Sequence, residues 1–229
     1  MSKKQVIGSL PGKVLGLLAD LMHKLRHGVI TVRELELFLQ RQDPFAITDI
    51  GGEWEEFYRK YFRLVVDFYG VTIALNPGDF DRVIFIPKGL KLNDVLEAIR
   101  KQFPAWSHED NLDKDIVENI RQSDKSYAIR LRERVEADEE LKSLSANQLK
   151  QQGVNAITLL ERLVLELKYW SETGQHLDVS NITMCAGSYD RDGGVLGVRW
   201  DADGGRLHII DWFSPNGAGG IVRARQVIS

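Results

Sequence analysis

The sequence predicts an α+β protein with a largely helical N-terminal two-thirds, a few short strands, and a C-terminal antiparallel β-meander. Apolar residues recur at helical spacing through much of the first 172 residues. After Glu172 the composition changes: residues 178–229 contain nine glycines but neither lysine nor glutamate, and β-branched and aromatic residues alternate there. A long apolar helix expected at 156–172 would cover one face of this sheet.

The chain has 229 residues, enough for one large domain or two small ones. We expect an N-terminal helical hairpin at 1–50 and an α+β core at 51–229, whose C-terminal sheet occupies 178–229. No Ser/Pro-rich linker separates these parts, so a single compact domain is the alternative.

Two helices are expected in the first 41 residues. Leu17, Leu21 and other apolar residues recur at helical spacing in the first helix, and Gly28 is a natural end for it. Thr31 and Glu34 have the spacing of a capping box, which predicts the start of the second helix. That helix should end at Asp43, because the residue before a proline avoids helical angles.

The middle of the chain predicts short alternating elements. Helices are expected at 53–63, 93–103 and 134–142, with a helical turn or two within 112–120. Strands are expected at 64–68, 71–75, 82–87 and 126–132.

Two more helices precede the sheet. Ser145 and Gln148 form a second capping-box pattern, and Gly153 closes that short helix. The following helix, 156–172, is apolar around most of its circumference, which is typical of a core element.

The five-letter words DRDGG (190–194) and DADGG (201–205) raise the question of a cation site. A calcium loop counted from Asp190 would have its glycine misplaced and a short aspartate at its twelfth position. Asp-Gly between apolar alternating flanks instead favours hairpin turns. Two equal turns would align Cys185, Trp200 and Leu207 across the meander. Cation binding is the weaker alternative, through Asp190, Asp192, Asp201 and Asp203.

Composition narrows the function classes. A net charge of −3 argues against a general nucleic-acid coat protein, and a single cysteine fits a reducing cytosol and excludes an internal disulfide. No apolar stretch approaches the roughly 20 residues that span a bilayer. No nucleotide-binding, metalloprotease or nucleophile-elbow motif occurs. We therefore expect a cytoplasmic protein with no cofactor and no membrane or nucleic-acid partner.

Histidines beside carboxylates supply the candidates for catalysis. His176 lies near Glu172 and Asp178 in sequence, and His108 lies near Asp110. A histidine paired with a carboxylate is a potential general acid or base, because its pKa lies near working pH. The competing interpretation is that both histidines bond loop backbone or face water.

The first helical pair also has the outline of a helix-turn-helix DNA reader. Residues 1–41 carry seven lysines and arginines against three acids. Glu34 and Glu36 lie on the helix that would enter the groove, however, and the negative DNA phosphates would repel them. DNA binding through residues 13–41 is therefore the weaker hypothesis, and packing of the hairpin is the alternative.

Three stretches resemble a group of uncharacterised small proteins from genomes of uncultivated bacteria. They are SYAIRLRERVEADEELKSLSANQL (126–149), ITLLERLVLELKYWSETGQHLD (157–178) and the strand around NITMCAGS (181–188). The resemblance implies a bacterial, cytosolic protein. It carries no catalytic residue over.

These observations favour a non-catalytic binding or regulatory module over an enzyme. Its ligand, a protein or a small molecule, would lie on the C-terminal sheet and its loops, where the glycine-rich stretch 216–220 suits a mobile loop. The alternative is a hydrolase or transferase that uses His176 with Asp178 or Glu172.

Overall fold

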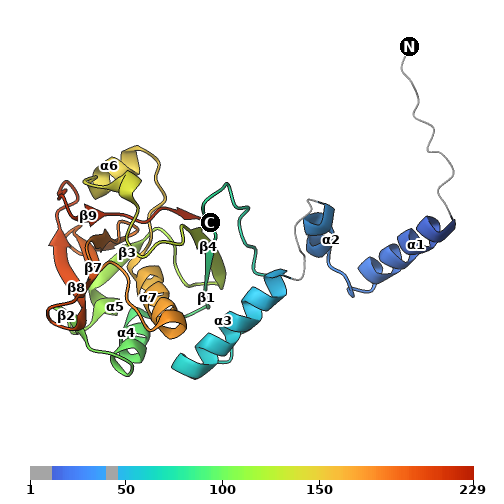
Figure 1. Cartoon of the computed structure of the whole chain (residues 1–229), viewed down its shortest axis with the longest axis horizontal. Helices are drawn as coiled ribbons and strands as arrows, with labels where there is room; N and C mark the ends of the chain where they lie inside the picture. The colour runs from blue at the N-terminus through green and yellow to red at the C-terminus, as the bar shows by residue number, and fades with distance from the viewer. Residues whose placement is uncertain (1–11, 40–45) are drawn as a thin grey trace, which may run out of the picture. The chain divides into compact units, whose positions relative to one another are not determined.

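The computed structural model describes residues 12–39 and 46–229. The chain divides into two compact units, Met1–Ile50 and Gly51–Ser229. The first unit contains α1 (Gly12–Arg26) and α2 (Val32–Leu39), coloured blue in Figure 1. Helix α3 (Ala46–Phe62) begins in the first unit and continues into the second.

Local capping signals set the described ends of α1 and α2. Gly28 follows α1 with a φ of +69°, which suits glycine because it has no Cβ. The amide of Glu34 donates to Thr31 Oγ1 at 3.1 Å, and the Thr31 amide donates to Glu34 Oε2 at 2.6 Å. The predicted capping box is therefore confirmed. The helix end expected at Asp43 lies outside the described residues.

Gly51–Ser229 combines short helices with ten strands among its described residues. After α3, the helices are α4 (Leu92–Arg100), α5 (Leu112–Asp115), α6 (Ala146–Gln151) and α7 (Leu159–Thr173), with a 3-10 turn at Glu139–Leu141. The strands are β1 (Arg82–Ile86), β2 (Ala105–Ser107), β3 (Ile116–Asn119), β4 (Tyr127–Leu131), β5 (Ile182–Met184), β6 (Ser188–Asp190), β7 (Val195–Asp201), β8 (Arg206–Phe213), β9 (Val222–Arg223) and β10 (Val227–Ile228).

The strands form three sheets, so the predicted C-terminal antiparallel meander is wrong. One sheet has the order β1-β4-β10, a second has the order β2-β8-β7-β5-β9, and a third pairs β3 with β6. The five-stranded sheet is mixed, because β2 runs parallel to β8 and β9 runs parallel to β5. Strand β2 comes from far upstream in the chain, and β10 leaves to pair with β4.

The expected helical N-terminal two-thirds is also wrong. Strands β1 to β4 lie between residues 82 and 131, and the described helices other than α6 and α7 lie before residue 116. Helix α7 is buried over most of its length, as expected of a core element, but its main neighbours are α4 and β1 rather than the C-terminal sheet (Figure 1). The helix therefore packs mainly on elements that precede it in sequence.

Three local predictions in the middle of the chain are also wrong. Residues 64–68 and 71–75 have no strand partner and are not strands. The acidic helix expected at 134–142 is reduced to the 3-10 turn. Tertiary hydrogen bonds replace its helical ones: the amide of Asp138 donates to Ala224 O, and the amide of Ala137 donates to the Asp178 carboxylate.

The two glycine-rich words form turns, as predicted. The first joins β6 to β7, and the second joins β7 to β8, where Asp201 pairs with Arg206. Trp200 faces Leu207, but Cys185 does not lie in that row, since its amide donates to Leu196 O. The predicted alignment fails because β6 intervenes after Cys185 and pairs with β3 in another sheet.

Gly187 lies where three segments meet, and we expect its replacement to be costly. A Cβ built there would lie 2.8 Å from Ala156 O and 3.0 Å from Ile157 O. Because both neighbours are backbone atoms, they cannot rotate away. Gly187→Ala should lower the free energy of unfolding by about 1–3 kcal/mol, measured by urea denaturation. Gly220→Ala, with open space around its Cβ position, is the control, and an equal effect at both sites would contradict the prediction.

Candidate functional site

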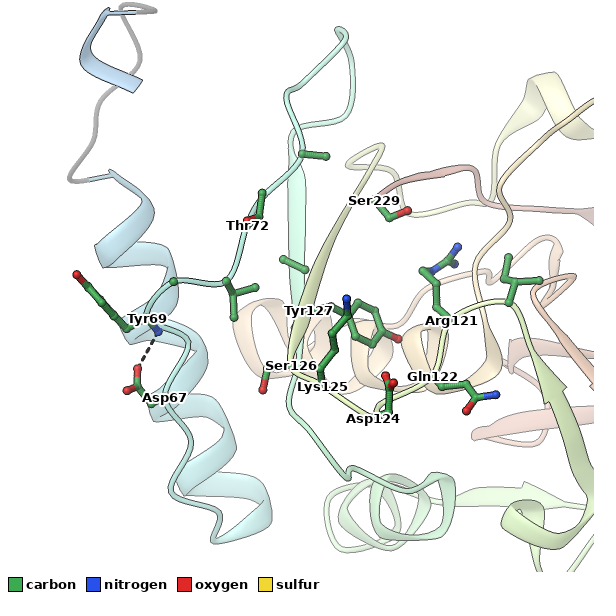
Figure 2. Close-up of a pocket in the computed structure, with 15 residues that line it drawn as sticks. Asp67, Tyr69, Thr72, Arg121, Gln122, Asp124, Lys125, Ser126, Tyr127 and Ser229 are labelled. Carbon is green, nitrogen blue, oxygen red and sulfur yellow. Dashed lines mark hydrogen bonds between the residues drawn. The ribbon is translucent and has the colours of Figure 1, made fainter. Parts of the chain in front are cut away.

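A cavity of about 790 Å³ opens beside the sheet formed by β1, β4 and β10. One wall comes from residues 67–74, which follow α3, and the other comes from residues 120–128, which lead into β4. Ser229 also lines it. Figure 2 shows Thr72 on one wall and Arg121, Lys125 and Tyr127 on the other, whereas the side chain of Tyr69 points away from the second wall.

The wall at 120–128 is held in place by the buried carboxylate of Glu161. Arg121 donates through Nε and Nη2 to Glu161, each at 2.7 Å. Its Nη1 donates to Asn155 Oδ1, and its Nη2 also donates to Ala156 O. The hydroxyl of Tyr127 donates to Glu161 at 2.9 Å. Glu161 also accepts from the amide of Thr158 in the capping box that starts α7. The core helix therefore positions this wall.

Electrostatics keep both wall residues in their protonated forms. Burial raises the pKa of Tyr127 far above its usual range, and Glu161 raises it further, so the phenol remains a donor. For Arg121, burial works against the charge, but the hydrogen bonds and the charge of Glu161 outweigh burial and raise its pKa. Arg121 therefore stays cationic and neutralises Glu161.

The remaining lining offers polar groups to a ligand. The opposite wall is a turn in which the Tyr69 amide donates to Asp67 at 2.7 Å, and the Tyr69 ring is 70% exposed. Asp124 and Lys125 make no hydrogen bond or ion pair with any residue that the structure describes. No histidine or cysteine lines the cavity. The chemistry available there is recognition through hydrogen bonds and charge.

His176 lies elsewhere, against aromatic rings. Its ring stacks on Trp200 with centroids 3.4 Å apart and an interplanar angle of 3°, and Phe103 meets it edge-on at 4.7 Å. Its Nδ1 lies 2.9 Å from Glu166 Oε1. Glu172 instead binds Arg82 and Lys168. The hydrogen bond of His176 thus goes to a carboxylate ten residues back on α7.

Asp178 is the centre of a buried charge cluster formed by Arg162, Glu166, Asp178, Thr183 and Arg225. Its carboxylate contacts Arg162 at 2.8 Å and Arg225 at 2.7 Å and accepts from the Thr183 hydroxyl. Arg162 also pairs with Glu166 at 2.8 Å. Because Asp178 forms ion pairs with two arginines in the interior, its carboxylate stabilises the fold.

Sequence reasoning missed Glu161, Arg162, Glu166 and Arg225 as a set. Two signals were present in the chain. Thr158 and Glu161 have capping-box spacing, and five charged residues interrupt a largely apolar helix. Charged residues inside a core helix need partners, because burying an unpaired charge is costly. The partners themselves come from distant segments and leave no local signal.

Asp190 and Asp201 have local partners within the two turns. Asp190 Oδ1 accepts from the amides of Asp192 at 2.6 Å and Gly194 at 2.9 Å, and Asp201 lies 3.7 Å from Arg206 Nε. Within the described residues, no group of three or more His, Cys, Asp or Glu side chains is arranged to hold a metal ion. His108 lies edge-on to Trp106, with ring centroids 6.1 Å apart.

Cys185 is fully buried, and we expect its thiol to be unreactive in the folded protein. Burial raises its pKa to about 12, with Asp178 and Glu161 adding to the rise and nearby arginines opposing it. The reactive thiolate is therefore scarce at neutral pH. Iodoacetamide at pH 8 should leave the native protein unlabelled and label it fully in guanidinium chloride, as mass spectrometry would show. Rapid native labelling would contradict the expected burial.

Comparisons of the chain with known proteins found no similar protein. No family model matches the chain, and neither the curated proteins nor the solved structures contain a match. Among the described residues, no helix is both long enough and apolar enough to cross a membrane.

Proposed function

We propose that this protein is a non-catalytic binding module whose ligand occupies the cavity between residues 67–74 and 120–128. One observation carries the proposal: Glu161 fixes Arg121 and Tyr127 from behind, so one wall is formed before any ligand arrives. A site that is already organised loses less conformational entropy on binding. The volume of about 790 Å³ lies in the range typical of small-molecule sites.

The charges of the lining favour a small polar molecule that has both donor and acceptor groups. Arg121 is neutralised by Glu161, so it adds little net charge. Asp124 and Lys125 then offer one acceptor and one donor side by side.

We extend the proposal to a cytoplasmic setting without a membrane or nucleic-acid partner. The single buried thiol suits a reducing compartment, and the net charge of −3 disfavours binding to phosphate backbones. Fluorescence anisotropy with a labelled duplex tests this extension, and tight binding at physiological salt would count against it.

A fragment screen by ¹H–¹⁵N NMR tests the cavity. Polar fragments that bind should shift the amide signals of residues 69–74 and 120–128. Thr72→Trp, which places a large ring in the cavity, should abolish these shifts. Gln151→Trp, at an exposed position on α6 outside the cavity, is the matched control and should leave them intact. Shifts that survive Thr72→Trp, or that cluster elsewhere, would refute the proposal.

A third variant distinguishes the hypothesis of a binding module from the hypothesis of a hydrolase or transferase. His176→Ala should leave fragment affinity unchanged, because His176 does not line the cavity. It should lower the melting temperature, because it removes the ring stacked on Trp200 and one of the two partners of Glu166. Loss of fragment binding in this variant would favour a site built around His176.

A further inference from the structure

One face of the five-stranded sheet carries a row of aromatic and basic side chains. Trp106 on β2 pairs with His208 on β8, and His208 pairs with Arg199 on β7. Asp201 and Arg206 form the next pair in the register that lies on the same face. Paired residues on neighbouring strands point to the same side of a sheet, so these five side chains are neighbours.

Arg199 differs from the other described arginines that have a buried side-chain nitrogen without a partner. Six arginines have a side-chain nitrogen that is buried without a hydrogen-bond partner: Arg82, Arg132, Arg162, Arg199, Arg206 and Arg223. Five of them reach a carboxylate through the same guanidinium. The side chain of Arg199 makes no ion pair or hydrogen bond with any described residue.

Among the described residues, the Nε of Arg199 has no hydrogen-bond acceptor. Its Nε is out of contact with water, and a buried donor without an acceptor costs free energy. Carboxylate and phosphate groups match the planar fork of arginine through paired hydrogen bonds. An oxyanion is therefore the missing chemical partner at this face.

Trp106 and Arg206 extend the surface beside Arg199. Trp106 is 37% exposed as a residue. The His208 ring lies edge-on to its ring at 4.6 Å, and the Arg206 guanidinium carbon lies 5.9 Å from the ring centroid. Asp201 lies 3.7 Å from Arg206 Nε and offsets that charge. Arg199 is thus the arginine left to hold an anion, and Trp106 offers a flat surface for stacking two strands away.

We propose that this face binds a small molecule that carries an oxyanion, either carboxylate or phosphate, next to a planar ring. The oxyanion pairs with Arg199, and the ring lies against Trp106. This site is independent of the cavity at 67–74 and 120–128, because none of its residues lines that cavity. It agrees with the expectation that a ligand lies on the C-terminal sheet.

Matched pairs of probes test the proposal on the full chain. Adenosine monophosphate and benzoate carry both groups, whereas adenosine and benzamide lack the oxyanion. Isothermal titration calorimetry should detect the two charged probes and not the two neutral ones. In ¹H–¹⁵N spectra, the charged probes should shift the amides of residues 105–107 and 206–210.

Arg199→Gln should weaken the binding of both charged probes by about tenfold or more, because it removes a charge-assisted hydrogen bond. Its melting temperature without ligand should be unchanged or higher, since Arg199 has no partner among the described residues. A purely structural role would instead lower it. Arg191→Gln, at an arginine whose side chain is 62% exposed, is the matched control and should bind normally.

Arg206→Gln provides a second variant, expected to weaken the charged probes less than Arg199→Gln because Asp201 already offsets its charge. Equal affinity for adenosine and adenosine monophosphate would overturn the proposal. So would normal binding by Arg199→Gln, or the absence of binding by both charged probes at millimolar concentration.

Discussion

Replacing Asp178 with alanine is expected to lower the free energy of unfolding by about 3–5 kcal/mol. The carboxylate is fully buried between Arg162 and Arg225 and also accepts from the amide of Ala137. Without it, two arginines remain in the interior with their shared partner removed. Removing one member of a buried ion pair costs more than the pair contributes, because the remaining charge is uncompensated.

Urea denaturation monitored by circular dichroism measures this change. Asp203→Ala, at an exposed turn position, is the control and should change stability by less than about 0.5 kcal/mol. A loss below about 1 kcal/mol in Asp178→Ala would show that water or rearrangement compensates the two arginines.

The same carboxylate predicts a dependence of stability on pH. Burial alone would raise the pKa of Asp178, but Arg225 and Arg162, with the Thr183 hydrogen bond, outweigh burial and hold it below its usual value. Its contribution to stability is therefore fully present above the unfolded-state pKa of about 3.9 and is lost as the pH falls through the folded-state pKa. Asp178→Asn should show a smaller loss of stability below pH 4 than the native chain. If the free energy of unfolding fell equally with pH in the two proteins, Asp178 would not be the source of this dependence.

Glu161→Gln is expected to affect both the fold and the proposed cavity. The substitution leaves Arg121 without its buried counter-charge and weakens the capping box of α7. We expect a loss of about 3–5 kcal/mol in the free energy of unfolding, as for other broken buried pairs. In the fraction that remains folded, the wall of Arg121 and Tyr127 should loosen.

Two measurements separate these effects. Urea denaturation gives the stability, and ¹H–¹⁵N spectra in native buffer report whether the amides of residues 120–128 broaden. Glu97→Gln, on the exposed face of α4, is the control for a neutral change of the same size. An unchanged spectrum together with normal fragment affinity would show that Glu161 does not organise the cavity.

The parts of the fold that were predictable from the sequence are those with local causes. The capping boxes at Thr31 and Ser145 and the left-handed Gly174 after α7 depend on atoms within a few residues. Strands at 82–86 and 127–131 were found because each is an apolar or alternating run. The turns at the two glycine-rich words were predicted from Asp-Gly pairs between alternating apolar flanks, which is also a local signal.

The candidate sites were not predictable in this way, because their partners are distant in sequence. His176 was expected beside Asp178 or Glu172, but helix geometry brings Glu166 to it. Asp178 binds Arg225, 47 residues away, and the cavity joins segments about 50 residues apart. Short-range patterns carry no information about such pairs.

By itself, the sequence determined where the two helices with capping boxes at Thr31 and Ser145 begin, that 156–172 contains a core helix, and that the glycine-rich words are turns. Only the tertiary structure decided which strands pair, where the buried charges find partners, and which surfaces remain open. The physical reason is the distance along the chain between the groups that interact. Caps and turns are satisfied by hydrogen bonds within one turn of chain, whereas sheet order and ion pairing depend on which distant segments bury the same apolar surface.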